Sequence, residues 1–191
     1  MVERWTVRFG GFGGQGIVLS SVVTGLAAVY DGNYVCQRAS YGSEARGGKC
    51  KSEVIISDVE ISYPLIDDLQ VLVIMSKQAL DSYIDELEPR GLLIVDPDMV
   101  DDPDRRQDIE VLKIPAAKTA DKLGNRIVAN MIMLGALQAK TGIVSKDALM
   151  KSMEDSVASR FVEINRKAIK TGGQILGGIA AGGEDSSGGL G

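Results

Sequence analysis

The stretch Gly10-Gly11-Phe12-Gly13-Gly14-Gln15-Gly16 lies between two apolar runs, residues 5–9 and 17–19. This order predicts a strand, a tight glycine turn and the start of a helix, a context in which the pattern G-x-G-x-x-G gains weight. The backbone N–H groups of such a turn can come close to an anion, which the positive end of the helix also attracts. We therefore expect a phosphate-binding turn formed by Gly11, Gly13, Gly14, Gln15 and Gly16.

The end of the second predicted strand, residues 34–38, limits which ligand this turn could bind. A nicotinamide site usually has Asp or Glu at this position to hold the ribose hydroxyls, but the strand ends in Gln37 and Arg38. NAD is therefore disfavoured, whereas Arg38 leaves NADP or the 3′-phosphate of coenzyme A open. The alternative is that the glycines only let the first helix pack tightly on its strand.

A polar loop without hydrophobic periodicity, residues 40–48, follows the second strand. In an open α/β sheet this loop lies at the carboxyl edge, on the same side as the glycine turn. Ser40 and Arg46 could contact an anion there, and Tyr41 could contact a flat ring. The alternative is a wide surface turn between two strands.

Hydrophobic patterning along the rest of the chain predicts one α/β domain. We expect a three-layer α/β/α Rossmann-like fold with a mostly parallel, mixed sheet and a helical C-terminal part. Further strands are expected at 49–57, 58–62, 71–75, 92–95 and 109–114, and helices at 17–29, 77–87, 125–140, 145–153 and 156–170. Residues 58–62 would form a short hairpin partner, and Ser76 would cap the second helix. The domain is expected to span residues 1–170, and the Gly/Ser-rich residues 171–191 to form a flexible tail.

Composition excludes several functions. The chain has 191 residues and a net charge of −5, which argues against nucleic-acid binding. No apolar run is long enough to span a membrane, and the N-terminus lacks the apolar stretch of a secretory signal, so we expect a cytoplasmic protein.

The residues available for chemistry are equally restricted. Histidine is absent, which removes the commonest general base and zinc ligand. Cys36 and Cys50 are too few for an iron–sulfur cluster and are expected to be small hydrophobic residues. The acidic run 101–104 lacks the alternate spacing of a calcium loop. We therefore predict no catalytic residue, no metal site and no tightly bound cofactor in this chain, and expect it to be part of a larger assembly.

Three segments together resemble the gamma subunit of the 2-oxoacid:ferredoxin oxidoreductases, most closely the 2-oxoglutarate branch. They are G-G-F-G-G-Q-G at 10–16, S-Y-G-S-E-A-R-G-G at 40–48 and N-R-x-x-x-N-M-x-x-L-G-A-L at 125–137. The resemblance extends from about residue 4 to about residue 170, with Ser43 standing where the family more often has proline. The indolepyruvate branch carries a similar domain, so the choice of 2-oxoglutarate depends on the resemblance alone.

This resemblance implies a complex that oxidatively decarboxylates a 2-oxoacid with coenzyme A, giving acyl-CoA, CO₂ and reduced ferredoxin. Thiamine diphosphate with Mg²⁺ would lie between the alpha and beta subunits, and the [4Fe-4S] clusters would belong to the beta and delta subunits. The partners would be the alpha, beta and delta subunits and, through the complex, ferredoxin. The gamma subunit carries none of these cofactors and would be inactive alone.

We therefore hypothesise that this chain covers the thiamine site from one side and helps receive coenzyme A. The glycine turn would donate backbone hydrogen bonds to a phosphate, and Arg38 and Arg46 would add charge-assisted contacts. Tyr41 and Glu44 could instead face the alpha subunit. Two alternatives stay open: a purely structural interaction module of the same complex, and a free-standing NADP- or flavin-binding oxidoreductase, which only Arg38 supports.

Overall fold

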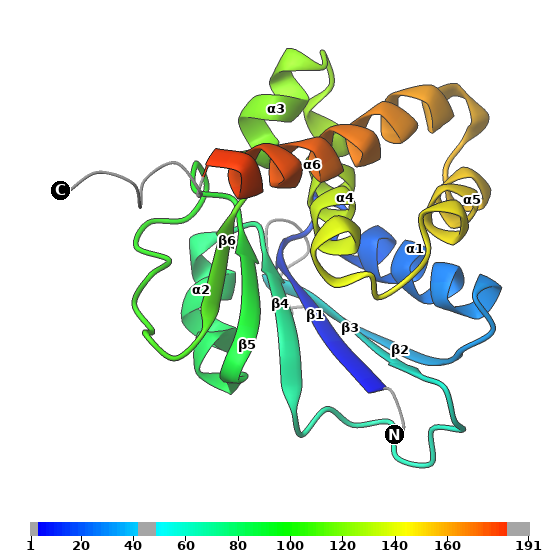
Figure 1. Cartoon of the computed structure of the whole chain (residues 1–191), viewed down its shortest axis with the longest axis vertical. Helices are drawn as coiled ribbons and strands as arrows, with labels where there is room; N and C mark the ends of the chain where they lie inside the picture. The colour runs from blue at the N-terminus through cyan, green and yellow to red at the C-terminus, as the bar shows by residue number, and fades with distance from the viewer. Residues whose placement is uncertain (1–3, 42–48, 183–191) are drawn as a thin grey trace, which may run out of the picture.

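A six-stranded mixed sheet forms the centre of the computed structural model, which describes residues 4–41 and 49–182 (Figure 1). The strands are β1 (Arg4–Phe12), β2 (Tyr34–Tyr41), β3 (Lys49–Ser57), β4 (Leu69–Ile74), β5 (Leu87–Val95) and β6 (Glu110–Lys113). Their order across the sheet is β2-β3-β1-β4-β5-β6. β1, β4, β5 and β6 run parallel, whereas β3 runs antiparallel to both neighbours. The predicted mixed, mostly parallel sheet is confirmed.

Helices cover both faces of this sheet. They are α1 (Ile17–Tyr30), α2 (Lys77–Tyr83), α3 (Ala116–Lys122), α4 (Ala129–Thr141), α5 (Lys146–Ser156) and α6 (Val162–Gly182), with short 3-10 turns η1 (Ile84–Glu86), η2 (Arg126–Val128) and η3 (Ser159–Phe161). One apolar cluster joins α1, α4, α5 and α6 to one face, and a smaller cluster joins α2 to the other. The three-layer α/β/α arrangement and the helical C-terminal part are therefore as predicted.

β4 shows how the sequence builds two cores at once. Val71 and Val73 belong to the larger cluster, whereas Leu72 and Ile74 belong to the smaller one on the opposite face. A parallel strand buried on both faces appears in the sequence as a continuous apolar run, which is the signal that predicted it. Cys50 is also buried in the larger cluster, which agrees with its expected packing role.

The second helix is capped as predicted but ends early. The Ser76 hydroxyl accepts a hydrogen bond from the Ala79 N–H at 3.3 Å. The helix ends at Tyr83 because β5 already begins at Leu87, not at residue 92. Pro89 is tolerated there because the pairing of β5 with β4 shifts register between Leu87 and Leu92, so no ladder hydrogen bond is lost.

The expected hairpin strand at residues 58–62 is wrong. These residues are described and contain no strand. The reason is that β3 is already paired on both sides, with β1 and with β2, so it has no free edge for a further partner. The local sequence pattern of residues 58–62 does not show whether β3 still has a free edge for pairing.

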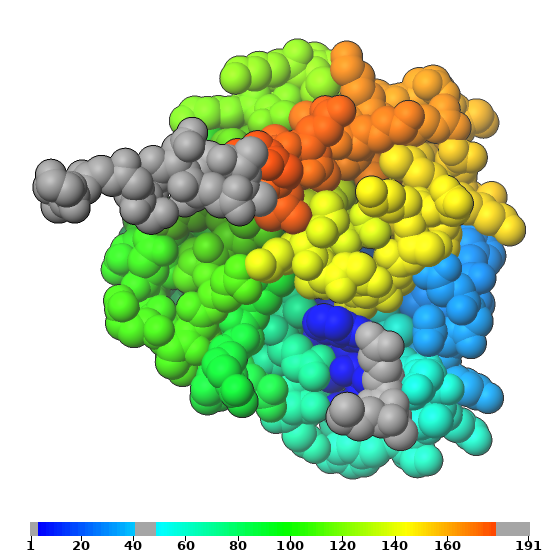
Figure 2. All heavy atoms as spheres, in the orientation of Figure 1, coloured from blue at the N-terminus to red at the C-terminus, as the bar shows by residue number. Residues whose placement is uncertain are grey.

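The expected helix end at residue 170, and with it a flexible tail beginning at 171, is also wrong. α6 continues to Gly182 and crosses α4 closely, and in the space-filling view their atoms lie directly on one another (Figures 1 and 2). A Cβ at Gly172 would overlap the carbonyl oxygen of Ile132, and one at Gly135 would overlap that of Ile169. These glycines are therefore helix-packing residues. The residues beyond 182 lie outside the described part of the chain.

Among the helices of residues 4–41 and 49–182, none has the length and apolar character of a membrane span.

Candidate functional site

The glycine turn joins β1 to α1, as the sequence predicts. β1 continues through Phe12, so Gly11 is a strand residue and the turn itself comprises residues 13–16. Gly14 has φ +99° and Gly16 has φ +75°, a left-handed conformation that glycine adopts without strain. Gly16 is also the N-cap of α1, and no side chain caps the helix there. The N-terminus of a 14-residue helix therefore meets the turn directly.

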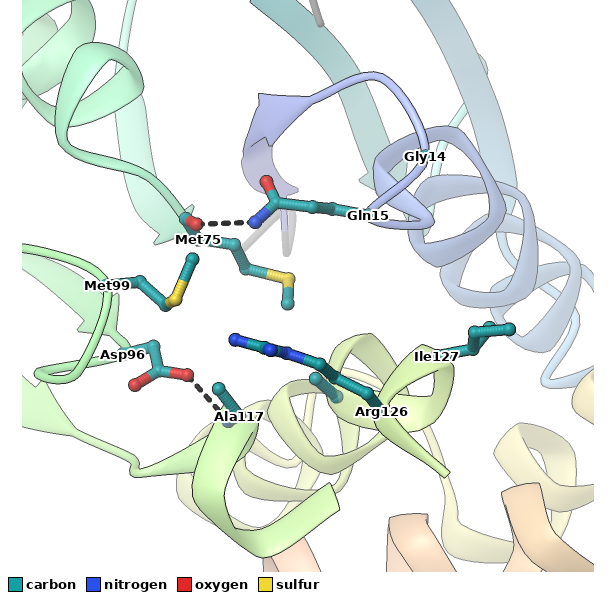
Figure 3. Close-up of a pocket in the computed structure, with 9 residues that line it drawn as sticks. Gly14, Gln15, Met75, Asp96, Met99, Ala117, Arg126 and Ile127 are labelled. Carbon is teal, nitrogen blue, oxygen red and sulfur yellow. Dashed lines mark hydrogen bonds between the residues drawn. The ribbon is translucent and has the colours of Figure 1, made fainter. Parts of the chain in front are cut away.

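Gln15 braces this turn. Its side-chain oxygen accepts a hydrogen bond from the Phe12 N–H at 2.7 Å, and its Nε2 donates to the Met75 carbonyl oxygen at 2.8 Å (Figure 3). Gly11 makes room for the brace, because a Cβ there would lie 2.5 Å from the Gln15 oxygen. Gln15, predicted as a ligand contact, thus uses its amide to tie the turn to the end of β4.

Asn130, on α4, fixes the C-terminal end of the turn through a hydrogen bond to Gly16. Its side chain is 2% exposed, and its Nδ2 lies 3.2 Å from the Gly16 carbonyl oxygen and 3.4 Å from the Ser20 hydroxyl. A Cβ on Gly16 would overlap the Asn130 amide. Sequence reasoning did not single out Asn130 as a site residue. The signal that could have found it is its place as the second asparagine of the N-R-x-x-x-N motif, within an otherwise apolar helical segment.

A pocket of about 260 Å³ opens beside the turn (Figure 3). It lies where β1, β4 and β5 end, which is the edge where open α/β sheets bind ligands. The residues around it come from the glycine turn, the strand ends, α3, η2 and α4: Gly14, Gln15, Met75, Asp96, Met99, Ala117, Arg126, Ile127 and Ala129. Its walls are thus mainly apolar, with a few converging polar groups.

Asp96 forms the polar floor of this pocket. It is fully buried, and its two carboxylate oxygens accept hydrogen bonds from the backbone N–H groups of Ala117 at 2.7 Å and Asp98 at 3.0 Å. Burial raises the pKa of Asp96, although these two hydrogen bonds oppose the shift. The carboxylate therefore holds the start of α3 in place. It was not predicted from the sequence as a site residue.

Arg126 supplies positive charge to the pocket. Its side chain points across the pocket, as Figure 3 shows, and it forms no ion pair with any residue in the ranges 4–41 and 49–182. It comes from η2, held by the Asn125 side chain, which accepts the Ile127 N–H. Arg126 is the arginine of the N-R-x-x-x-N motif, but the sequence analysis gave it no role, and the structure places it in the pocket.

Arg38 lies elsewhere. It is on β2, separated from β1 by β3, and its guanidinium Nη2 is 2.7 Å from Glu53 Oε2. Arg8 contacts the other Glu53 oxygen at 2.7 Å, on the face of the sheet opposite α1. Burial alone would raise the pKa of Glu53, but its hydrogen bond to Arg38 and the charges of Arg8 and Lys51 lower that pKa instead. The structure therefore engages Arg38 in a sheet ion pair and does not bring it into the pocket.

The loop after β2 begins later than predicted. The strand was expected to end at residue 38, but its pairing with β3 continues through Ser40 and Tyr41, so these two residues belong to β2 and not to the loop. Register places Gly11 of β1 and Tyr41 of β2 opposite the same residue of β3, Cys50, so both strands end at one edge of the sheet. Ser40 is exposed at this edge. Glu44 and Arg46 lie outside the described residues, so their predicted contacts stay predictions.

Comparison with known proteins gives a consistent result. Residues 6–175 match the family model described as pyruvate ferredoxin/flavodoxin oxidoreductase. The chain is 46% identical over 184 residues to the 2-oxoglutarate synthase subunit KorC of Methanothermobacter thermautotrophicus, covering 92% of this chain and 97% of the relative.

Solved structures agree. The gamma subunit of a keto/oxoacid ferredoxin oxidoreductase from Geobacter sulfurreducens superposes with a TM-score of 0.80 at 39% identity, over 91% of this chain and 99% of that one. The 2-oxoglutarate:ferredoxin oxidoreductase from Magnetococcus marinus, solved with 2-oxoglutarate, coenzyme A and succinyl-CoA bound, has the same fold, with a TM-score of 0.85 at 22% identity. That match covers 92% of this chain but 31% of the longer chain. From its sequence, its fold and these comparisons, this chain belongs to the pyruvate ferredoxin/flavodoxin oxidoreductase family, as a gamma subunit of a 2-oxoacid:ferredoxin oxidoreductase.

Proposed function

We propose that this subunit serves a complex that oxidises 2-oxoglutarate with coenzyme A, and that its glycine turn receives a phosphate of coenzyme A while the subunit covers the thiamine diphosphate site. The choice of 2-oxoglutarate is supported by the 46% identity to a KorC subunit. The role in coenzyme A binding is supported by the geometry of the turn. The alpha, beta and delta subunits, and ferredoxin through them, would be the partners, in the cytoplasm.

One observation carries the proposal: the outer part of the turn, Gly13 and Gly14, is exposed and no side chain packs against it. Gly13 and Gly14 are exposed, and a Cβ built at either would meet nothing within 4 Å. Within residues 4–41 and 49–182, no group accepts a hydrogen bond from their backbone N–H. Two free N–H groups at the positive end of α1 are suited to an anionic oxygen.

Arg126 strengthens this anion site. Its guanidinium shares the pocket with Gly14 and can donate two hydrogen bonds to one phosphate. The apolar walls, Met75 and Met99 among them, suit an uncharged part of the same ligand. Arg126 thus takes the role that the sequence suggested for Arg38, which is paired with Glu53 and lies outside the pocket. A contact from Arg46 stays part of the proposal.

The remaining chemistry belongs to other subunits in this proposal. Thiamine diphosphate, when bound there with Mg²⁺, would supply the carbanion chemistry of decarboxylation, and [4Fe-4S] clusters would carry the electrons. The residues of this chain would bind and orient coenzyme A and exclude water from one side of the site. A gamma subunit with these tasks needs backbone donors, a cation and a rigid support, all of which the glycine turn, Arg126 and Asn130 provide.

The substitution Gly13→Ala tests the proposal. Gly13 has open space and no left-handed backbone, so alanine fits the fold but places a methyl group where the phosphate would approach. In the purified complex we expect the KM for coenzyme A to rise at least fivefold, with the KM for 2-oxoglutarate and the subunit composition unchanged. Gly177→Ala, also in open space but on α6, is the matched control. An unchanged KM for coenzyme A would contradict the proposal.

A purely structural role of the turn is the second candidate. The tight packing of Gln15 and Asn130 around Gly11 and Gly16 favours it. It differs in its prediction, because Gly13→Ala would then impair assembly of the complex and leave the KM for coenzyme A unchanged.

A further inference from the structure

We propose that the surface around Ile127 docks a partner subunit, with an apolar partner side chain entering the hollow beside it. We call this surface the Ile127 ridge, and it consists of the protruding Ile127 together with three apolar residues that line the adjoining hollow, Leu19, Val157 and Phe161. The inference rests on the proposed assembly of this chain with other subunits. It does not depend on coenzyme A binding by the glycine turn.

Exposure of Ile127 is the first observation. Its side chain is 75% exposed, more than any other large hydrophobic residue within the described ranges. It is held in place nevertheless, because its N–H donates to the Asn125 side chain at 3.2 Å and Val128 beside it is buried. Burial of a fixed, exposed isoleucine against a partner is favourable, because it removes apolar surface from water.

The shape around Ile127 is the second observation. A hollow of about 300 Å³ lies on one side of it, lined by Leu19, Val128, Val157 and Phe161 among others. The pocket that contains Arg126 lies on its other side. Figure 3 shows the division, because Arg126 points into that pocket whereas Ile127 points away from it. A protruding residue with an apolar hollow next to it is the pattern of an interface hot spot, a knob paired with a socket.

Charge at the rim indicates what the partner carries. Arg160 lies over the Phe161 ring, with 4.8 Å between its guanidinium carbon and the ring centroid. It forms no ion pair within the part of the chain that the structure describes, although the whole chain carries a net charge of −5. A guanidinium stacked on a ring keeps its N–H edge free for a carboxylate. The fitting partner surface is therefore an apolar side chain with Asp or Glu next to it.

Position favours a different subunit over a second copy as the occupant. Gly14 and Gly16 of the glycine turn line the same hollow, so a partner on the Ile127 ridge would also close over the turn. In the Magnetococcus marinus enzyme, a domain of this fold forms 31% of a longer chain and is covalently joined to further polypeptide. The equivalent of that polypeptide here would be a separate subunit.

Co-purification with the alpha and beta subunits tests the inference. Ile127→Asp places a charge in the centre of the ridge, and Val29→Asp makes the same change at another exposed residue, 51% exposed near the end of α1. From cells that express all subunits, we expect tagged Ile127→Asp to recover at least tenfold less alpha and beta subunit than Val29→Asp. Equal recovery by the two variants would overturn the inference. Matching far-UV circular dichroism and melting temperatures would show that both chains are folded.

A photo-crosslinking residue in place of Ile127 gives a second readout that does not depend on weakening the complex. A crosslink to the alpha or beta subunit, absent when the same residue replaces Val29, would support the inference. A crosslink only to a second copy of this chain, or none in the assembled complex, would overturn it. If Gly13→Ala raises the KM for coenzyme A while Ile127→Asp assembles normally, the docking inference is wrong and the proposed coenzyme A site stands.

Discussion

The two sides of the glycine turn differ in what surrounds them. On the inner side, Gly11 and Gly16 are glycines because a Cβ would collide with Gln15 and Asn130. On the outer side, Gly13 and Gly14 face open space. The glycines of one motif therefore have two roles. The inner glycines make room for the side chains of Gln15 and Asn130, which fix the turn, and the outer glycines leave backbone N–H groups accessible. Substitutions on the two sides should separate stability from ligand binding.

The largest loss of stability is expected from Gly16→Ala. The new methyl group would overlap the Asn130 amide, and alanine would have to adopt the left-handed φ of +75°. Strain and displacement of Asn130 together should cost about 3 kcal/mol. Urea unfolding of the isolated chain measures this cost, and a loss below about 1 kcal/mol would contradict the tight packing described here.

Asn130→Ala should have the next largest effect. It removes the hydrogen bond to the Gly16 carbonyl oxygen and leaves a small cavity at a fully packed position. We expect about 2 kcal/mol of destabilisation, measured by the same unfolding experiment. Asn130→Asp retains the size but replaces the donor, so it should also destabilise. A neutral result for both would show that Asn130 does not support the turn.

Gln15→Ala should cost less, about 1 kcal/mol, because water can replace part of the brace at a half-buried position. The orphaned groups are the Phe12 N–H and the Met75 carbonyl oxygen. Amide hydrogen exchange at Phe12 should become faster in this variant, while exchange within the central strand β4 stays unchanged. An unchanged exchange rate at the Phe12 amide would contradict the claim that the Gln15 side chain protects this N–H.

Gly13→Ala should leave stability unchanged within about 0.5 kcal/mol, because its backbone conformation suits alanine and nothing contacts the new methyl group. Thermal unfolding of the isolated chain tests this. A marked loss of stability would mean that the outer side of the turn is also structural, which would remove the contrast.

Local sequence predicted the turn because its signals lie within a few residues of one another. The same holds for the β3 strand, whose bounds, 49–57, match the structure. Asn130 and Arg126 were not predicted as site residues. More than 100 residues separate them from Gly16, and only the packing of α4 and η2 brings them to the turn. Arg38 was suggested as a phosphate contact from its place in the chain, but pairing with β3 sets it beside Glu53.

Glycine also misled the sequence interpretation at the C-terminal end. Gly172 and Gly173 suggest flexibility in the sequence, yet the structure places them in α6, where α4 approaches too closely for a side chain at Gly172. A pattern of small residues has opposite meanings in a free tail and at a helix crossing. Only the partner element distinguishes them, and it is distant in the sequence.

The most direct test of the central claim is the KM for coenzyme A of the complex that carries Arg126→Ala, compared with one that carries Arg38→Ala. A charge-assisted contact between a guanidinium and a phosphate is worth about 1.5–3 kcal/mol, which corresponds to roughly a 10- to 100-fold change. We predict a rise of that size for Arg126→Ala and none for Arg38→Ala, with the KM for 2-oxoglutarate unchanged in both. An unchanged KM for coenzyme A in the Arg126→Ala complex would contradict the claim that the ligand binds between Arg126 and the open side of this turn.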